Sequence, residues 1–367
     1  MNTYNPIDKT FLIIVLVLLC SGFFIFISAS LGLHAREGAG FSAIVFNQVF
    51  FGIVLGLGAM TFFSKIYYRN WKKYALHIFV LSIVLTVLTL IPLFGFEHGG
   101  AKRWISIGPF SFQPAEFLKF GTILYLSAWY ASIRNRVHTI KWGFMPLCVV
   151  LMINGFLLLS QPDTGTFLVI AATSCAIFLI AGGKWKHLFS LILVGILMLT
   201  ALAFSRPYVM DRMLTFVDPG RDPQGAGWQI QQSLIAIGSG EMFGKGFGQS
   251  VQKFNFLPEP IGDSVFAVAS EEFGFMGSSV IIVLFLLFLL RGLHIAKSAP
   301  DSFSGLLASG IVIMIVVQSF TNIASILGVF PLTGLPLIFI SHGGTAMLIT
   351  LAMIGIVLNI SRHKTNF

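Results

Sequence analysis

Four acidic residues cluster where a long polar stretch meets an apolar run. Glu259 and Asp263 lie in the sequence FLPEPIGDS, and Glu271 and Glu272 follow about two helical turns later inside the apolar run. Carboxylates within an apolar membrane helix cost free energy, so they usually have a function. Asp263 could simply cap the helix that follows. In a half-buried cleft it could instead act as a general base, with a pKa set by burial and neighbouring charge.

A second group of charges precedes and enters another apolar run. Glu116 and Lys119 are three residues apart, so one face of a helix presents both. They either pair with each other and hold helices together or line a polar cavity. Lys102, Arg103 and Trp104 lie upstream, where a Trp ring can anchor a helix at a membrane interface. The alternative is that the two cations bind a phosphorylated lipid headgroup, to which Arg offers a bidentate fork.

Two further polar sites lie at the ends of apolar runs. Asp163 follows a proline and precedes an apolar run, where helix capping is the leading interpretation. Ser341 and His342 come directly before a glycine pair. A lone histidine at such a position is more often a hydrogen-bonded helix-end residue than a ligand, and the glycines favour close helix contact or a flexible break.

The composition indicates what must position these side chains. The 367 residues are 56% hydrophobic and only 10% charged, against roughly 25% in a typical soluble domain. The formal net charge is +9, but the basic residues stand singly or in small groups between apolar runs, which is typical of membrane topology and not of a nucleic-acid site. The three cysteines all lie in apolar runs, which argues against a disulfide framework or a thiolate metal site.

The apolar runs predict an all-α polytopic membrane protein of about ten transmembrane helices, forming one domain over residues 1–367. We place the helices at 11–33, 43–63, 74–94, 114–131, 143–160, 164–182, 188–204, 264–290, 305–327 and 337–360. An even number puts both termini on one side, and the Lys and Arg residues of the loops on that side predict that it is cytoplasmic.

The opposite face carries the large loop 205–263, between the seventh and eighth predicted helices. A connection of about 60 residues is several times the usual length, so we expect it to be functional. Within it, Trp228–Ile237 has the spacing of an amphipathic helix and is expected to lie on the membrane surface.

The chain resembles the SEDS family (shape, elongation, division and sporulation), to which FtsW and RodA belong. The motifs run in order along nearly the whole chain and are specific as a set. They are Arg103-Trp104, FQPAEFLK (112–119), QPDTGT (161–166), DPQGAGWQ (222–229), QQS (231–233), FLPE (256–259) and ISHGG (340–344).

Within the family, GFGQSVQK (246–253) is closer to the division branch, FtsW, than to the elongation branch, RodA. Two departures from the family pattern stand out. The family usually has His-Thr before the loop aspartate, where this chain has Ile261-Gly262, and Tyr where this chain has His342. The aspartate itself, Asp263, is present.

The resemblance implies a peptidoglycan glycosyltransferase in the bacterial cytoplasmic membrane. It would polymerise lipid II on the outer face and work with a class B penicillin-binding protein and other divisome or elongasome proteins. Asp263 would take the proton of the acceptor hydroxyl, and the substrate would contact Lys102, Arg103, Trp104, Glu116, Lys119, Asp163, Glu259, Ser341 and His342. Diphosphate charge would be stabilised by Arg103, Lys119 or a divalent cation, Mg²⁺ or Mn²⁺.

Three alternatives stay open: a lipid II flippase, a RodA-type elongation role, and a noncatalytic scaffold for the penicillin-binding protein. A flippase often shows inverted repeats, and the two halves show no convincing repeat. The enzyme reading further predicts a groove open sideways to membrane lipid, floored near Glu116, Lys119 and Asp263, because a lipid-linked sugar must enter from the bilayer.

Overall fold

A computed structural model describes residues 6–37, 44–91, 95–98, 101–107, 110–205, 207–218, 220 and 225–364. Within these residues, seven helical stretches are long and apolar enough to cross a membrane, which confirms a multi-pass helical membrane protein. They are α1 (Lys9–Glu37), the π-helix η1 (Asn47–Val54) with α3 (Leu55–Lys65), α4 (Arg69–Leu88), η3 (Ile140–Phe144) with α6 (Met145–Ser160), α12 (Val265–Lys297), α13 (Ser302–Ile326) and α14 (Gly344–Ser361).

The other three predicted membrane helices also form helices in the structure. They are α5 (Pro114–Ser132), α7 (Thr164–Ile180) and α8 (Trp185–Ser205). The count of ten membrane crossings stays a prediction, because α5 and α7 fall short of the length or apolarity of the seven, and the apolar stretch of α8 that the structure describes in full is Trp185–Met198. The start of the last helix was placed too early, since α14 begins at Gly344 and not at Leu337.

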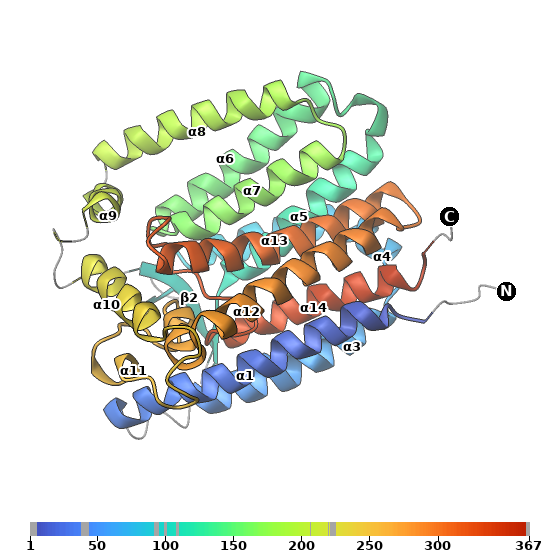
Figure 1. The fold of residues 1–367 in the computed structure, drawn as a ribbon. Helices are drawn as coiled ribbons and strands as arrows, with labels where there is room; N and C mark the ends of the chain where they lie inside the picture. The colour runs from blue at the N-terminus through green and yellow to red at the C-terminus, as the bar shows by residue number, and fades with distance from the viewer. Residues whose placement is uncertain are drawn as a thin grey trace.

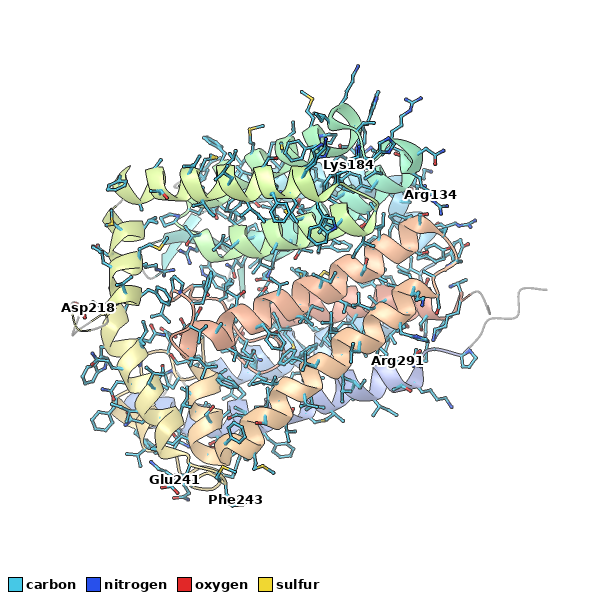
Figure 2. The ribbon with its side chains drawn as sticks, turned by 45° about the horizontal axis from the view of Figure 1, so that its top comes forward. Arg134, Lys184, Asp218, Glu241, Phe243 and Arg291 are labelled. Atoms are coloured by element: carbon cyan, nitrogen blue, oxygen red, sulfur yellow. The ribbon has the colours of Figure 1, made fainter. Side chains whose placement is uncertain are left out.

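The helices run side by side, and both termini lie at the same end of the bundle (Figure 1). The opposite end, here the distal end, carries α9 (Pro207–Val217), α10 (Ala226–Ser239) and α11 (Gln252–Asn255) from the long loop. The helix expected at Trp228–Ile237 therefore exists, as part of α10. Figure 2 shows Arg134, Lys184 and Arg291 at the end with the termini, as the charge pattern of the loops predicts.

A small sheet departs from the all-helical expectation. The strands β1 (Gly95–His98), β2 (Ala101–Ile107) and β3 (Phe110–Phe112) form an antiparallel sheet in that order. Trp104 is paired with Phe96, and Ile105 with Phe112. The hydroxyl of Thr345, at the start of α14, donates to the carbonyl of Ser111 (3.0 Å), which ties the sheet to the bundle.

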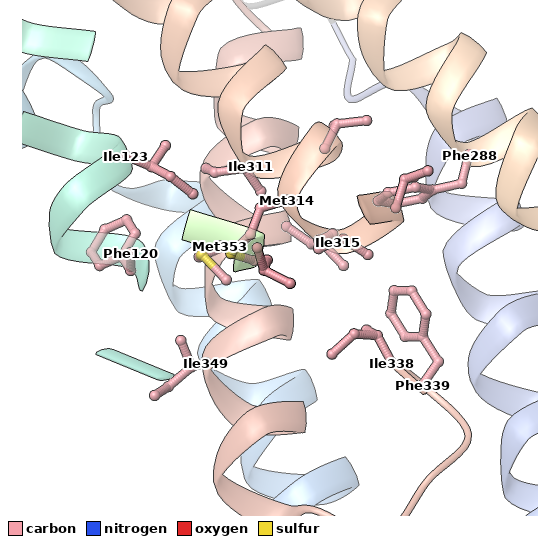
Figure 3. Packing of buried hydrophobic residues seen from close by; sticks show 14 of the residues in the cluster. Phe120, Ile123, Phe288, Ile311, Met314, Ile315, Ile338, Phe339, Ile349 and Met353 are labelled. Carbon is pink, nitrogen blue, oxygen red and sulfur yellow. The ribbon is translucent and has the colours of Figure 1, made fainter. Parts of the chain in front are cut away.

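The core is centred on α13, which with α14 is the most enclosed of the membrane helices. Figure 3 shows side chains of α13 in the middle of this core, with Ile123 of α5 on one side and Phe339 on the other. Phe339 belongs to the segment that joins α13 to α14. Residues 331–343 of that segment lack a regular helix, yet most are buried, so their backbone polar groups need partners inside the protein.

Helix α12 is broken at Gly274, where φ is +65° and ψ is −164°. A Cβ atom at Gly274 would stand 2.4 Å from the backbone nitrogen of Gly244 and 2.7 Å from the carbonyl oxygen of Met242. The long loop therefore packs backbone against backbone on the break, a contact that only glycine permits.

We expect Gly274→Ala to lower the thermal unfolding midpoint of the purified protein, because the new methyl group meets backbone atoms and the backbone strain costs about 1–3 kcal/mol. Gly58→Ala is the matched control, since a Cβ atom there meets nothing within 4 Å. If both variants unfold at the wild-type temperature, the contact at the break contributes nothing to stability.

Candidate active site

Two helices hold Asp263, which is partly buried directly before α12. The amide nitrogen of Gln229, on α10, donates to Asp263 Oδ1 and to the hydroxyl of Ser264, each at 2.9 Å. The side-chain nitrogen of Asn322, on α13, donates to the backbone carbonyl of Asp263 (2.7 Å). The carboxylate is therefore held by α10 and the backbone of Asp263 by α13.

The electrostatics suit Asp263 to accept a proton near neutral pH. Burial, and after it the negative charge of Glu259, raise the pKa of its carboxyl, which is about 6 once all neighbouring groups are included. The hydrogen bond from Gln229 and the positive charge of Arg212 act in the opposite direction. A carboxylate with a pKa of about 6 is still mostly ionised at pH 7 and is a stronger base than an ordinary aspartate.

Arg212 reaches this site from α9. Its Nη1 donates to the carbonyl of Leu332 (2.8 Å), and a Cβ atom at Gly334 would stand 4.0 Å from both Arg212 Nη2 and Asp263 Oδ2. The two side chains therefore face each other across Gly334. Sequence reasoning missed Arg212 and Asn322, which stand in none of the motifs, whereas Gln229 belongs to the DPQGAGWQ motif and could have been singled out.

The 331–343 segment supports the turn that carries Asp263. The hydroxyl of Ser341 donates to the carbonyl of Gly262 (2.6 Å) and accepts from the backbone N–H of Leu337 (2.8 Å). Ser341 is buried, so in this structure it holds the backbone next to Asp263 and a substrate contact by it stays a prediction.

The two departures from the family pattern lie together. The backbone N–H of His342 donates to the carbonyl of Ile261 (2.7 Å), and the His342 ring stacks on Phe26 of α1 with ring centroids 6.2 Å apart. His342 lies before α14 and not within it. The two departures therefore meet in one backbone hydrogen bond, next to the turn that carries Asp263.

Glu116 and Lys119 form a buried ion pair on α5. Lys119 Nζ lies 2.9 Å from Glu116 Oε1 and 2.8 Å from Oε2, and it donates to Gln318 Oε1 of α13 at 2.5 Å. Both side chains are buried. The geometry agrees with the interpretation that Glu116 and Lys119 pair with each other and join helices. Contact of either side chain with a substrate stays a prediction.

The 331–343 segment joins the ion pair to Asp263. Gln318 and Asn322 are one turn apart on α13, and their side-chain nitrogens donate to the carbonyls of Pro336 (3.2 Å) and Leu335 (2.7 Å). Asn322 also holds Asp263, and Gln318 also holds Lys119. The carboxylate and the cation therefore lie on one side of the bundle, as a shared site requires.

A lateral groove floored by these residues stays a prediction. Beneath the 331–343 segment lies a space of about 10 Å³, room for about one water molecule, lined by Ser341, Gly343 and neighbouring apolar residues. A larger groove of about 380 Å³ runs along α4, beside Trp71 and Tyr74, and none of the predicted site residues lines it.

Arg103 and Asp163 meet at the start of α7. Arg103 Nε donates to the carbonyl of Gln161 (3.1 Å), and its Nη2 donates to the carbonyl of Pro162. Asp163 Oδ1 accepts from the backbone N–H of Thr166 (3.2 Å), which is the predicted helix cap. Its Oδ2 is buried and has no hydrogen-bond partner among the described residues.

The remaining predicted residues are placed only in part. Trp104 is half-buried on β2. The backbone of Lys102 is also on β2, opposite Glu97, but its side chain lies outside the part of the chain that the structure describes, as does the stretch 221–224 of the DPQGAGWQ motif. Among the described residues no three His, Cys, Asp or Glu side chains gather in a way that could hold a metal by themselves.

Glu271 and Glu272 do not face Asp263. Lys245 Nζ lies 2.7 Å from Glu271 Oε1, and Lys253 Nζ lies 2.7 Å from Glu272 Oε1. Ser28 of α1 also donates to Glu272, at 2.6 Å. These acids therefore tie the long loop to α1 and α12, and this explains why charges at this depth are tolerated.

Comparison with known proteins supports the same grouping. The profile of a family described as "Cell cycle protein", which covers FtsW, RodA and SpoVE, matches residues 9–366. Stage V sporulation protein E of Bacillus subtilis is 38% identical over 310 residues, 84% of this chain and 85% of that protein. The protein of Trichlorobacter lovleyi named "Probable peptidoglycan glycosyltransferase FtsW" is 36% identical over 354 residues, 96% of this chain and 93% of its own length.

Solved structures agree. A chain from a peptidoglycan synthase complex, studied for the coordination of polymerization and crosslinking, superimposes with a TM-score of 0.80 at 28% identity and 99% coverage of both chains. The rod shape determining protein RodA of Thermus thermophilus superimposes with a TM-score of 0.70 at 26% identity, covering 100% of this chain and 99% of that one. With its motifs, its fold and a family match over nearly its whole length, the chain belongs to the SEDS family of FtsW, RodA and stage V sporulation protein E.

Proposed function

We propose that this chain is a peptidoglycan glycosyltransferase that polymerises lipid II. Relatives of the chain are named peptidoglycan glycosyltransferase FtsW. The observation that carries the proposal is Asp263, a partly buried carboxylate with a pKa of about 6, held by α10 and α13 on the side of the bundle that also carries Lys119. Transfer of a glycosyl group to a sugar hydroxyl needs a general base whose pKa lies near the operating pH.

In this mechanism Asp263 takes the proton of the acceptor sugar's 4-hydroxyl. The oxygen then attacks the anomeric carbon of the donor sugar, and the bond from that carbon to the diphosphate breaks. Undecaprenyl diphosphate leaves with the bonding electrons. Its negative charge is met by the guanidinium of Arg103 at the start of α7, and by Lys119 once Lys119 separates from Glu116.

A divalent cation, Mg²⁺ or Mn²⁺, is part of the proposal. Mg²⁺ is usually held by one or two carboxylates, water and substrate phosphate oxygens. The buried Oδ2 of Asp163, without a partner in the described part of the chain, is a suitable carboxylate oxygen for it. The cation would neutralise charge on the leaving diphosphate.

We further propose that the end with the termini faces the cytoplasm of a bacterium and that the distal end faces outward, where lipid II is polymerised. A class B penicillin-binding protein is the proposed partner, and the structural similarity to a synthase complex that coordinates polymerization with crosslinking supports it. The identity to proteins named FtsW favours a role in cell division.

The direct test uses purified protein, its cognate penicillin-binding partner and labelled lipid II in liposomes. The proposal predicts long glycan strands on a gel. Movement of lipid II across the bilayer without strand formation would instead support a flippase. Strand formation that needs only the partner would support a scaffold.

The initial rate of strand formation is expected to fall about tenfold per pH unit below pH 6, because Asp263 must be deprotonated to act as a base. Gln229→Leu removes a hydrogen bond to the charged carboxylate, so it should raise the pKa and move the acidic limb to higher pH. Glu259→Gln removes a like charge and should move the limb to lower pH.

The control for this pH series is Asp218→Asn, a change at an exposed acid that is not among the groups that shift the pKa of Asp263. Its acidic limb should coincide with that of the wild type. Shifts of the same sign in Gln229→Leu and Glu259→Gln would show that the limb belongs to another group.

A further inference from the structure

The loop that follows α10 turns large apolar side chains outward. Met242 is 53% exposed, Phe243 81% and Phe247 50%. Contiguous exposed apolar surface on a folded protein marks contact with another protein or with a membrane. We call residues 241–247 the distal loop.

The distal loop is fixed to the break in α12. The backbone N–H of Phe275 donates to the carbonyl of Glu241 (2.8 Å), and that of Met276 donates to the carbonyl of Met242 (3.1 Å). The N–H of Gly246 donates to the carbonyl of Glu272 (3.0 Å) in the reverse direction. The depth of the distal loop in the membrane is therefore the depth of Phe275.

The length of α12 fixes that depth. Arg291 is the first cation of α12 toward the end with the termini, where it pairs with Asp8 at 2.9 Å. From Phe275 to Arg291 the helix rises roughly 24 Å, at about 1.5 Å per residue. The hydrocarbon core of a bilayer is about 30 Å thick, so Phe275 lies inside it if Arg291 lies at its edge. Tilt of α12 would only place Phe275 deeper.

The exposed face of α12 continues onto the distal loop. Phe275 and Met276 are exposed at the break, and Val280, Val283 and Leu287 are exposed further along the same membrane helix. Figure 2 shows Phe243 at the side of the bundle, together with Glu241, whereas Asp218 marks its outer tip. Phe243 therefore lies at the side of the bundle and not at the outer tip of the distal end.

We propose that the distal loop is a membrane anchor, which inserts Met242, Phe243 and Phe247 among the acyl chains of the leaflet at the distal end. Apolar side chains buried at the boundary of headgroups and acyl chains supply this kind of interfacial binding. The anchor would hold the end of α10 at the membrane surface. Since α10 carries Gln229, it would also keep Asp263 at the depth where the diphosphate of a lipid-linked sugar lies.

The test measures depth with a nitroxide spin label in liposomes of phosphatidylcholine alone, with no other protein present. The label is placed by Phe243→Cys in full-length protein whose Cys20, Cys148 and Cys175 are replaced by Ala. Val280→Cys gives the lipid-facing reference and Asp218→Cys the aqueous one. Collision with oxygen, relative to a water-soluble nickel chelate, reports depth at each position.

We expect the oxygen-to-nickel ratio at 243 to exceed that at 218 several-fold and to lie below that at 280, because Val280 is five residues, roughly 7.5 Å, deeper along α12 than Phe275. A second label, at Met242→Cys, should give the same result if the variant at 243 folds poorly, and the lipid-like ratio at 280 reports that the bundle is intact. A ratio at 243 equal to that at 218 overturns the proposal. It is equally overturned if 243 is shielded from nickel only after a penicillin-binding protein is added, because the surface then belongs to a protein partner.

Discussion

Asp263→Asn is expected to lower the rate of glycan strand formation by about 10² to 10⁴-fold, the contribution typical of a general base. The amide keeps the shape of the side chain and an oxygen that can still accept the hydrogen bond from Gln229, so the fold should persist. What the variant lacks is the basic carboxylate. The measurement is strand formation from labelled lipid II by purified protein with its partner.

The matched control is Asp218→Asn, which changes an exposed acid of the same long loop. It should retain wild-type activity, and both variants should bind the penicillin-binding partner and unfold at similar temperatures. Near-normal strand formation by Asp263→Asn would remove Asp263 from the mechanism. The hydrogen bonds from the side chains of Asn322 and Ser341 to the backbone carbonyls of Asp263 and Gly262 would then have a structural role only.

The membrane fold could be predicted from sequence because its signal is local. About twenty apolar residues in a row must form a helix in lipid, where every backbone polar group needs a partner within the chain. The sheet was not predicted, because strands such as Phe110–Phe112 are too short to show a periodic pattern. The predicted start of α14 was wrong because residues 337–343 are as apolar as a membrane helix. Their backbone polar groups are instead hydrogen-bonded to side chains such as that of Gln48, which accepts from the N–H of Gly343 (2.9 Å).

The site shows where such local reasoning ends. Asp263 could be identified because an acid at the edge of an apolar run is conspicuous. Asn322 could not, since an amide in the middle of a helix shows its role only when its partners, the carbonyls of Asp263 and Leu335, are known. The crowding of acids suggested by Glu271 and Glu272 was misleading for the same reason, because their lysine partners come from the long loop.

Breaking the Glu116–Lys119 pair is expected to destabilise the protein by about 3–5 kcal/mol, because either single change leaves a buried charge without its partner. Lys119→Glu should be the more harmful reversal, since it also loses the donor to Gln318. The double variant Glu116→Lys with Lys119→Glu restores an opposite-charge pair, so it should unfold at a higher temperature than either reversal alone.

The pair of Arg69, which is exposed, and Asp301, which is partly exposed, provides the comparison at 3.4 Å, and Arg69→Gln should leave the unfolding temperature close to that of the wild type. Activity then separates the two roles proposed for Lys119. If the double variant recovers both stability and strand formation, the pair acts by joining α5 to the bundle. If it recovers stability but not strand formation, the position of the cation itself matters, as direct contact of Lys119 with the diphosphate requires. Fully additive losses of stability would show that the two charges are not coupled, against the 2.8 Å contact between them.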